Sequence, residues 1–168
     1  ATRLTERRQA QRESVESRVA AVAGMVNNST DQWVIWCHLN DESARLAASI
    51  PDAIDVKGSD TIETKEKRIM DFTEGRQRVL VTKPSIAGFG MNWQHCHRMA
   101  FVGLSDSFEQ FYQAVRRCWR FGQTKAVDVE VFTAESEGQV LANIKRKEAQ
   151  HHDMSDQMVD HMKELMKE

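Results

Sequence analysis

The sequence predicts an α/β fold: an open, mostly parallel sheet with helices on both faces and further helices at the two ends of the chain. Five short segments have the composition of strands. Segments with helical periodicity alternate with them, and turn-forming residues stand at the junctions. Strands that alternate with helices in this way form β–α–β units, in which neighbouring strands run parallel.

The expected strands are short and bounded by turn formers. The first four are mostly apolar, which is typical of buried strands, and the fifth alternates between apolar and polar residues. They are 33–37 ("WVIWC"), 53–56 ("AIDV"), 78–82 ("RVLVT"), 98–104 ("RMAFVGL") and 126–134 ("AVDVEVFTA").

Helices are expected between these strands, and local signals mark their ends. Two of them begin with an aspartate followed three positions later by a glutamate, a pattern that caps free backbone amides. The signals are Asn40 or Asp41 as the first cap with Pro51 as the stop, Asp60 with Glu63 and a closing Gly75, and Asp106 with Glu109 and a closing Gly122. The last helix is therefore expected to carry the arginine-rich segment that precedes Gly122.

A long helix is expected at each end of the chain. Residues 4–26 place four valines on one stripe, at Val15, Val19, Val22 and Val26. The arginines and glutamates of the same segment are expected on a solvated face with ion pairs along the helix. From residue 135 onward the chain is charged and rich in methionine, as in an amphipathic packing or partner helix.

Length and charge restrict the function. A chain of 168 residues favours one domain with a single sizeable core. The net charge of −2 gives no overall field for nucleic acid, so a basic surface must be local. Two segments qualify, the N-terminal run with Arg3, Arg7, Arg8, Arg12 and Arg18, and residues 116–125. No apolar run is long enough to cross a membrane, no signal peptide is present, and the start at an alanine suggests a fragment.

The cysteines and histidines do not predict a metal site. Cys37, Cys96 and Cys118 are far apart and odd in number, which indicates reduced thiols in a cytosolic protein. The run "HCH" at residues 95–97 is a poor ligand set, because adjacent residues of an extended chain point to opposite faces. No metal ligand is therefore predicted.

The segment "QAVRRCWRFGQ" (113–123) concentrates fixed positive charge. On a helix, Gln113, Arg117 and Arg120 lie on one face, because they are four and three positions apart. Guanidinium groups bind phosphate oxygens, and a rigidly held pair suits the charge that develops on a transferring phosphoryl group. The spacing alone is equally compatible with a salt-bridged surface helix.

The loop "SIAGFGMN" (85–92) adds a second signal. Gly88 and Gly90 allow the backbone to approach a ligand closely, and Asn92 supplies a polar side chain. The chain contains no P-loop motif and no Asp-Glu pair after an apolar strand that would hold magnesium. The sequence therefore carries half of a phosphoryl-transfer site.

These segments resemble motifs of one family. "QAVRRCWRFGQ" resembles motif VI of superfamily 2 helicases and translocases, in the SWI/SNF-type form Gln-Ala-x-x-Arg-x-x-Arg-x-Gly-Gln. "TKPSIAGFGMNWQ" resembles motif V, "WVIWCHLNDE" stands where motif IV belongs, and "VKGSDTIETKEKRIMDF" resembles the next block. The lead-in "LSDSFEQFYQA" is similar to phage and bacterial members. The resemblance covers residues 33–134.

The resemblance implies the second RecA-like lobe of a two-lobed, DNA-dependent ATPase. ATP with Mg²⁺ would be bound mainly by a first lobe of the same protein. Arg120 would be the arginine finger on the γ-phosphate, Arg117 its partner, and Gln113 an orienting residue. The remaining roles would be coupling of the nucleotide cleft to the bound strand by Gly88, Gly90 and Asn92, and DNA contact by Thr82, Lys83, Ser85 and Arg116.

The resemblance also divides the chain. Residues 1–30 would be a connector helix from the first lobe, 31–134 the RecA-like lobe, and 135–168 a helical extension that braces the lobe or touches DNA through Lys145, Arg146 and Lys147. The partners would be DNA and the first lobe, with no membrane, in the cytoplasm of a bacterial or phage-infected cell. The oligomeric state stays open, and the chain alone is expected not to hydrolyse ATP.

Two other hypotheses remain open. The chain is compatible with a stand-alone nucleic-acid-binding or protein-interaction module without ATPase activity. A small nucleotide-binding enzyme is the weaker alternative, because no nucleophile and base pair supports it.

Overall fold

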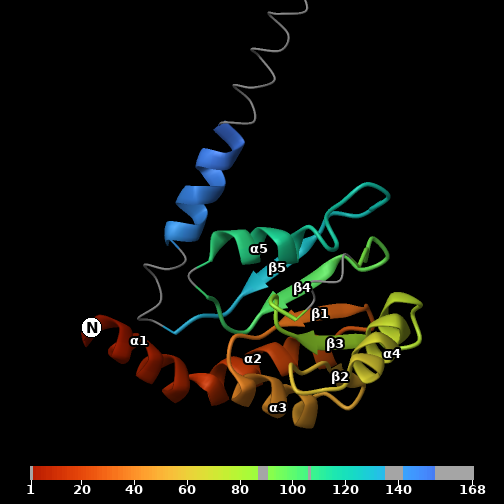
Figure 1. Ribbon diagram of the computed structural model, residues 1–168, viewed down its shortest axis with the longest axis horizontal. Helices are drawn as coiled ribbons and strands as arrows, with labels where there is room; N and C mark the ends of the chain where they lie inside the picture. The colour runs from red at the N-terminus through yellow and green to blue at the C-terminus, as the bar shows by residue number, and fades with distance from the viewer. Residues whose placement is uncertain (1, 87–90, 106, 135–141, 154–168) are drawn as a thin grey trace, which may run out of the picture.

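A computed structural model describes residues 2–86, 91–105, 107–134 and 142–153 (Figure 1). The elements alternate along the chain in the order that the sequence predicts. They are α1 (Thr2–Glu13), α2 (Val15–Asn27), β1 (Trp33–Trp36), α3 (Asn40–Ser49), β2 (Ala53–Asp55), α4 (Ile62–Thr73), β3 (Val79–Thr82), β4 (Arg98–Phe101), α5 (Phe108–Val115) and β5 (Asp128–Val131), followed by a helical segment at 142–153.

The sheet has five strands in the order β2-β3-β1-β4-β5, and every neighbouring pair is parallel. The central strand β1 has Trp33 opposite Val79 on one side and opposite Arg98 on the other. Because all strands run the same way, their carboxyl ends meet at one edge. Ligands of open α/β sheets bind outside that edge.

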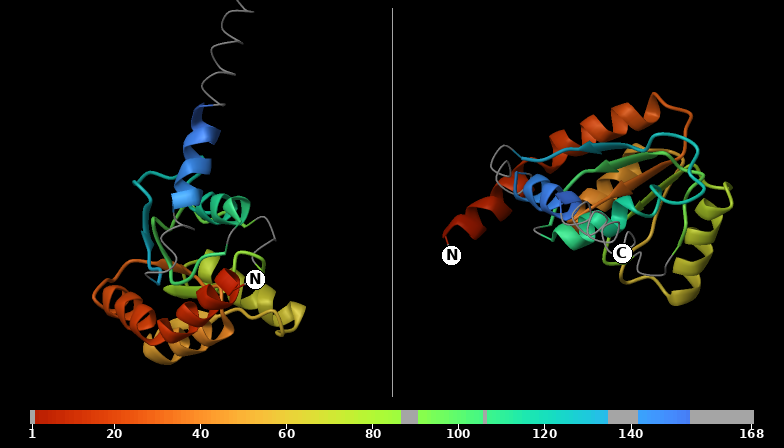
Figure 2. Two further views of the ribbon diagram at one scale, coloured as in Figure 1. Left: turned by 90° about the vertical axis from the view of Figure 1, so that its left-hand side faces the viewer. Right: turned by 90° about the horizontal axis from the view of Figure 1, so that it is seen from above.

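Helices cover both faces of the sheet, as predicted (Figures 1 and 2). Alternate residues of β1 point to opposite faces: Trp33 and Ile35 pack in one core cluster, and Val34 and Trp36 in the other. The first cluster contains buried residues of α2 and α3, and the second those of α4 and α5. The molecule is therefore a three-layer α/β lobe.

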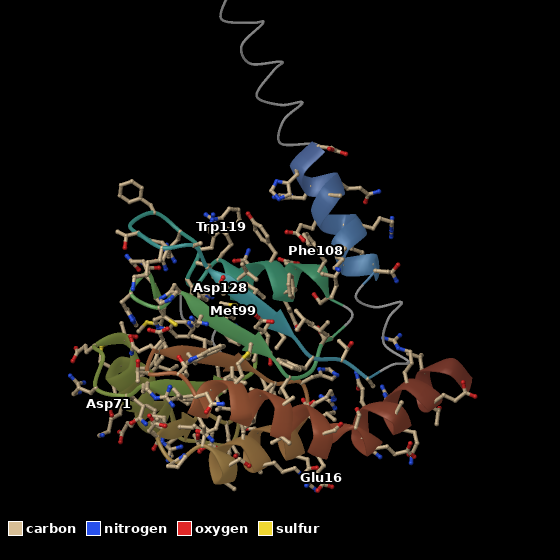
Figure 3. The ribbon with its side chains drawn as sticks, turned by 180° about the vertical axis from the view of Figure 1, so that it is seen from behind. Glu16, Asp71, Met99, Phe108, Trp119 and Asp128 are labelled. Atoms are coloured by element: carbon tan, nitrogen blue, oxygen red, sulfur yellow. The ribbon has the colours of Figure 1, made fainter. Side chains whose placement is uncertain are left out.

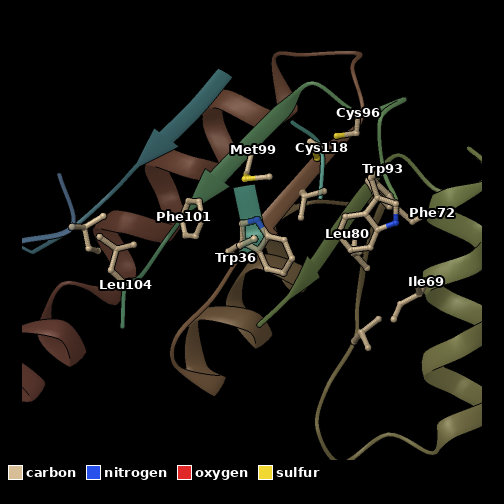
Figure 4. Packing of buried hydrophobic residues seen from close by; sticks show 14 residues of the cluster. Trp36, Ile69, Phe72, Leu80, Trp93, Cys96, Met99, Phe101, Leu104 and Cys118 are labelled. Atoms are coloured by element: carbon tan, nitrogen blue, oxygen red, sulfur yellow. The ribbon is translucent and has the colours of Figure 1, made fainter. Parts of the chain in front are cut away.

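An aromatic group anchors the segment that leads into β4 (Figure 4). The ring of Trp93 lies 6.0 Å from that of Trp36 and 5.4 Å, edge to face, from that of Phe72. The Trp93 indole Nε1 donates to Thr73 Oγ1 at 2.9 Å. A buried indole with its polar atom satisfied fixes both the position and the orientation of this segment.

The N-terminal segment differs from its prediction in two ways. It forms two helices that meet at Ser14 instead of one. The valine stripe of α2 is buried as predicted, but Arg18 on the same helix is also buried and pairs with Glu42 of α3. The prediction of a solvated face is wrong for Arg18 because α3 supplies a buried countercharge.

The helix caps also differ from their predictions. The carboxylate of Glu42, not Asn40 or Asp41, accepts hydrogen bonds at the start of α3, from the backbone of His38 and Leu39. Thr61 caps α4 by accepting from the Thr64 backbone, because the Asp60 carboxylate is bound by the Lys57 backbone. Ser107 caps α5, while the predicted Asp106 lies outside the described residues. Gly75, at φ 78°, closes α4 as predicted.

The helical segment 142–153 lies against α5. The His151 ring is 5.0 Å from that of Tyr112 and 6.4 Å from that of Phe108, and Ile144 is buried. Residues 135–141 and 154–168 of the predicted extension lie outside the described residues. Lys145, Arg146 and Lys147 are exposed. In the described part of the chain, no helix has the length and apolarity needed to cross a membrane.

Candidate functional site

The arginines of the motif VI-like segment lie on a turn and not on a continuous helix. The helix α5 ends at Val115, so the predicted helix to Gly122 is wrong beyond that residue. Beyond it the backbone hydrogen bonds change to a three-residue spacing, from the Arg117 N–H to the Ala114 carbonyl and from the Cys118 N–H to the Val115 carbonyl. The Arg117 carbonyl accepts from the backbone N–H of Trp93 at 2.7 Å. We call residues 116–122 the arginine turn.

Arg117 and Arg120 form a cationic pair on this turn. Both side chains are half-buried. Within the described residues, neither guanidinium makes a hydrogen bond or an ion pair. Burial, and then the charge of Arg120, lower the pKa of Arg117. Two half-buried cations without a carboxylate are stabilised by an anion, and phosphate oxygens fit guanidinium geometry best.

Gln123 holds the arginine turn against the sheet. Its side-chain Nε2 donates to the carbonyl of Cys96 at 2.9 Å and to that of Cys118 at 3.2 Å. The Cys118 thiol is fully buried beside Cys96, and its hydrogen bond with Cys96 and its burial raise the pKa of Cys118 (Figure 4). Gly122 ends the turn at φ 93°, a conformation that favours glycine. Sequence reasoning missed Gln123 and Trp93 as positioning residues, although both stand in the quoted motifs.

Two other polar residues of the motif VI-like segment, Gln113 and Arg116, face outward. Gln113 and Arg116 are exposed, and the Arg116 guanidinium lies 5.5 Å from the centre of the Trp119 ring. Trp119 itself is 47% exposed at the surface beyond α5 (Figure 3), and Phe121 is fully exposed. The predicted row of Gln113, Arg117 and Arg120 is therefore split, with only the two arginines half-buried.

The motif V-like loop is described only at its two ends. Gly88 and Gly90 lie outside the described residues. Asn92 is exposed next to Trp93, whose backbone binds the arginine turn. Asn92 is therefore one residue away from Trp93, whose backbone N–H binds the Arg117 carbonyl.

The three residues of "HCH" have separate neighbours. His95 Nδ1 lies 2.7 Å from Gln32 Oε1, and burial lowers the pKa of His95. Cys96 packs with Cys118, and His97 Nε2 lies 3.8 Å from a carboxylate oxygen of Asp31. Among the described residues no group of three His, Cys, Asp or Glu side chains is placed to hold a metal ion.

Of the four predicted DNA contacts, Thr82, Lys83 and Ser85 lie at the carboxyl edge of the sheet, whereas Arg116 lies on the arginine turn. Lys83 and Ser85 line a cavity of about 310 Å³ at this carboxyl edge, together with Ser107 and Gln110 at the start of α5. Lys83 Nζ donates to Asn40 Oδ1 at 2.6 Å. Thr82 is different: it is buried and its hydroxyl donates to the Val56 carbonyl at 3.2 Å, so that hydroxyl is not presented to a ligand.

The candidate residues thus form two groups at opposite edges of the sheet. The arginine turn binds residues 93 and 96, which precede β4, whereas Lys83 and Ser85 follow β3. The helix α5 runs between the groups, because its first residues line the cavity and its end leads into the arginine turn. The loop 83–92 connects the same two places.

The fold and these two groups define an α/β lobe of the RecA type with a half-buried cationic pair. A family profile described as the helicase conserved C-terminal domain matches residues 11–122, which is more than half of the chain. The chain belongs to this family and is a C-terminal RecA-like helicase lobe.

Solved structures of helicase lobes share the fold. The C-terminal part of the Fun30 ATPase domain aligns with a TM-score of 0.65 at 18% identity, over 76% of this chain and 44% of that one. The C-terminal domain of the DEAD-box protein Dbp5 aligns with a TM-score of 0.69 at 17% identity, over 79% of this chain and 78% of that one. The chain spans less than half of the Fun30 fragment. No curated protein matched the chain.

Proposed function

We propose that this chain is the second motor lobe of an ATP-dependent DNA helicase or translocase of the SWI/SNF-like type. The observation that carries the proposal is the pair Arg117 and Arg120. Both are half-buried, and within the described residues both lack an acidic partner. A lobe with charge-stabilising arginines and no P-loop motif in its sequence needs a second lobe to complete a nucleotide site.

The residues fit ATP as a shared ligand. The cationic pair suits phosphate oxygens, while the phosphate loop and the magnesium carboxylates would come from the first lobe. ATP with Mg²⁺ would supply a phosphoanhydride bond whose cleavage places negative charge on the transferred group. Arg120 would stabilise that charge, and Arg117 would hold phosphate or an acidic residue of the first lobe. Gln123 would keep both arginines in place through the carbonyls of Cys96 and Cys118.

Two of the DNA contacts, Lys83 and Ser85, would come from the opposite edge of the lobe, where they line the cavity beside α5. The third, Arg116, would come from the exposed side of the arginine turn itself. A DNA strand held at Lys83 would be connected to the nucleotide by two elements, the loop 83–92 and α5. Coupling of nucleotide turnover to DNA binding would use these two connections.

Substitution of each arginine in the two-lobed protein tests the proposal. We expect Arg117→Ala and Arg120→Ala each to lower DNA-stimulated ATP turnover by roughly 10³-fold, as loss of an arginine finger does. DNA affinity should change less than about twofold, because phosphate contacts to DNA lie elsewhere. Arg45→Ala is the control, since Arg45 is exposed on α3 and, within the described part of the chain, pairs only with Asp41 of the same helix.

The opposite pattern would identify a binding module. In that case either arginine substitution would weaken DNA binding and reduce its dependence on salt, and the unmodified protein would show no DNA-stimulated turnover. Normal turnover by Arg120→Ala would also contradict the proposal.

A further inference from the structure

Three hollows along the carboxyl edge of the sheet share their lining residues. A cavity of about 480 Å³ beside Lys57 and Gly58 shares Lys83 and Ser85 with the 310 Å³ cavity already described. The 310 Å³ cavity in turn shares His38, Leu104 and Ser105 with a third cavity of about 200 Å³, and residues of α1 form the other wall of this third cavity. The three hollows are neighbours along the edge from the loop after β2 to α1, and together we call them the edge groove.

The edge groove has a positive lining although the chain has a net charge of −2. None of its described lining residues is an aspartate or a glutamate. Its cations are Lys57, Lys83, Arg7 and Arg8. A row of cations without acidic residues is what the phosphates of a nucleic-acid strand require.

Two described carboxylates near the groove, those of Asp55 and Glu42, are paired with cations. Asp55 lies 3.2 Å from Lys57 Nζ, so Lys57 contributes less than its full charge. Glu42 is buried behind Gly103 in its ion pair with Arg18. Among the described residues, Lys83 and the exposed Arg8 of α1 are lining cations that make no ion pair.

The last turn of α1 is fixed to the lobe. Gln11 is buried, and its Nε2 donates to the Leu104 carbonyl at 3.5 Å. Arg18 Nη2 donates to the Gln11 carbonyl at 2.6 Å. Arg7 and Arg8 lie four and three residues before Gln11, so they share its side of the helix and reach the groove that Leu104 lines.

Most of the helix α1 contributes no buried residue to the core. Leu4 is 52% exposed, and from Leu4 to Ala10 no described residue of the helix is buried. A helix that is polar all round and fixed only at its end presents its charged side chains to a partner. A partner bound at α1 can extend along the edge groove as far as Lys83.

We propose that α1 extends the DNA track of this lobe, with Arg8 and the neighbouring Arg7 contacting the sugar-phosphate backbone of a DNA strand that also passes Lys83 and Ser85. The inference rests on the proposed function of the lobe, because it takes DNA as the ligand of the edge groove. It adds a phosphate-binding site at the end of the groove opposite Lys57. The contact is to the backbone, so it carries no base preference.

Fluorescence anisotropy of a short labelled DNA duplex, titrated with this chain over a range of salt concentrations, tests the site. Arg8→Gln should weaken binding roughly 5- to 10-fold at low salt and reduce the salt slope by about 1, as loss of one phosphate contact does. Arg7→Gln should act in the same direction. Arg76→Gln is the matched control, since Arg76 is exposed at the opposite edge, beside Asp71 and Glu74.

A further variant separates failure of the inference from failure of the proposed function. Weaker binding by Lys83→Gln together with unchanged binding by Arg8→Gln would overturn the inference and leave the DNA-binding lobe standing. Equal losses in Arg8→Gln and Arg76→Gln would mark a net-charge effect and would also overturn it. Absence of DNA binding by the unmodified chain at low salt would contradict both proposals. Thermal unfolding of each variant checks that the fold is retained.

Discussion

The guanidinium of Arg18 and the carboxylate of Glu42 form a buried ion pair, with the two side chains only 4% and 1% exposed. The carboxylate also accepts from the backbone of His38 at 2.8 Å and of Leu39 at 2.7 Å, and Arg18 donates to the Val102 carbonyl as well. The pair therefore joins α2 and α3 to the chain just beyond β1 and β4. Both of those segments continue into walls of the edge groove.

Removal of one charge from this pair should destabilise the lobe strongly. Glu42→Gln leaves the Arg18 guanidinium buried without a countercharge, and we expect the free energy of unfolding to fall by about 3 kcal/mol. Arg18→Met combined with Glu42→Gln should cost less than the sum of the two single substitutions. Urea unfolding of the four proteins measures the coupling, and costs that simply add would show that the pair does not interact.

Gly103 should be needed because of its closeness to this carboxylate. A Cβ at position 103 would lie 2.6 Å from Glu42 Oε2 and 2.7 Å from Oε1, and the carboxylate cannot move without losing its partners. We expect Gly103→Ala to lower the free energy of unfolding by about 1–3 kcal/mol. Gly24→Ala is the matched control: it lies within α2 with open space around its Cβ position and should raise stability by about 0.5–1 kcal/mol. Equal effects of both changes on urea unfolding would contradict the packing argument.

Substitution of Gln123 should impair ATP turnover more than stability. Gln123→Leu keeps most of the side-chain volume but removes the donor that binds the Cys96 and Cys118 carbonyls. The arginine turn then shifts, and we expect DNA-stimulated turnover of the two-lobed protein to fall about 10- to 100-fold. The value of kcat should fall while DNA affinity is kept. Unchanged kcat would mean that other contacts suffice to hold the turn.

Low pH should weaken the surface ion pair between Arg78 and Asp52. Arg78 donates to the Asp52 carboxylate, at 3.0 Å from Nη2 to Oδ1, and this hydrogen bond lowers the pKa of Asp52. Because the folded pKa is lower than the unfolded one, the stabilisation is present at neutral pH and is lost as pH falls through the folded pKa. Asp52→Asn should therefore lower the Tm at pH 7, and its difference from the unmodified chain should shrink toward pH 3. A difference that is constant with pH would exclude the ion pair as the cause. The effect should be small, since Asp52 is 48% exposed.

The sequence was sufficient for the sheet and the helical layers, because buried strands and amphipathic helices have distinct periodicities. The valine stripe from Val15 to Val26 lies in the core as predicted. The features that the sequence did not predict depend on contacts between residues that are far apart in the chain. Arg18 was assigned to a solvated face because its partner, Glu42, is 24 positions away and no local pattern connects the two.

For the candidate site too, the sequence predicted some features and missed others. The motif spacing selected Arg117 and Arg120, but helical periodicity extended α5 too far: the helix ends at Val115, and the following turn binds Trp93 through the Arg117 carbonyl, a contact that no local pattern shows. The edge groove was not foreseen, since it combines residues of α1 with four strand ends. Direct contact of DNA with the Thr82 hydroxyl, implied by the resemblance, is not supported by a buried side chain bound to Val56.

ATP turnover of this chain, with and without DNA, alone and then mixed with the upstream lobe, tests the central claim most directly. We expect no turnover by the chain alone, because the cationic pair is one half of the site. DNA-stimulated turnover should appear on mixing and be lost when the added chain carries Arg120→Ala. Turnover by the chain alone would contradict the half-site account and require a complete phosphate site within these 168 residues.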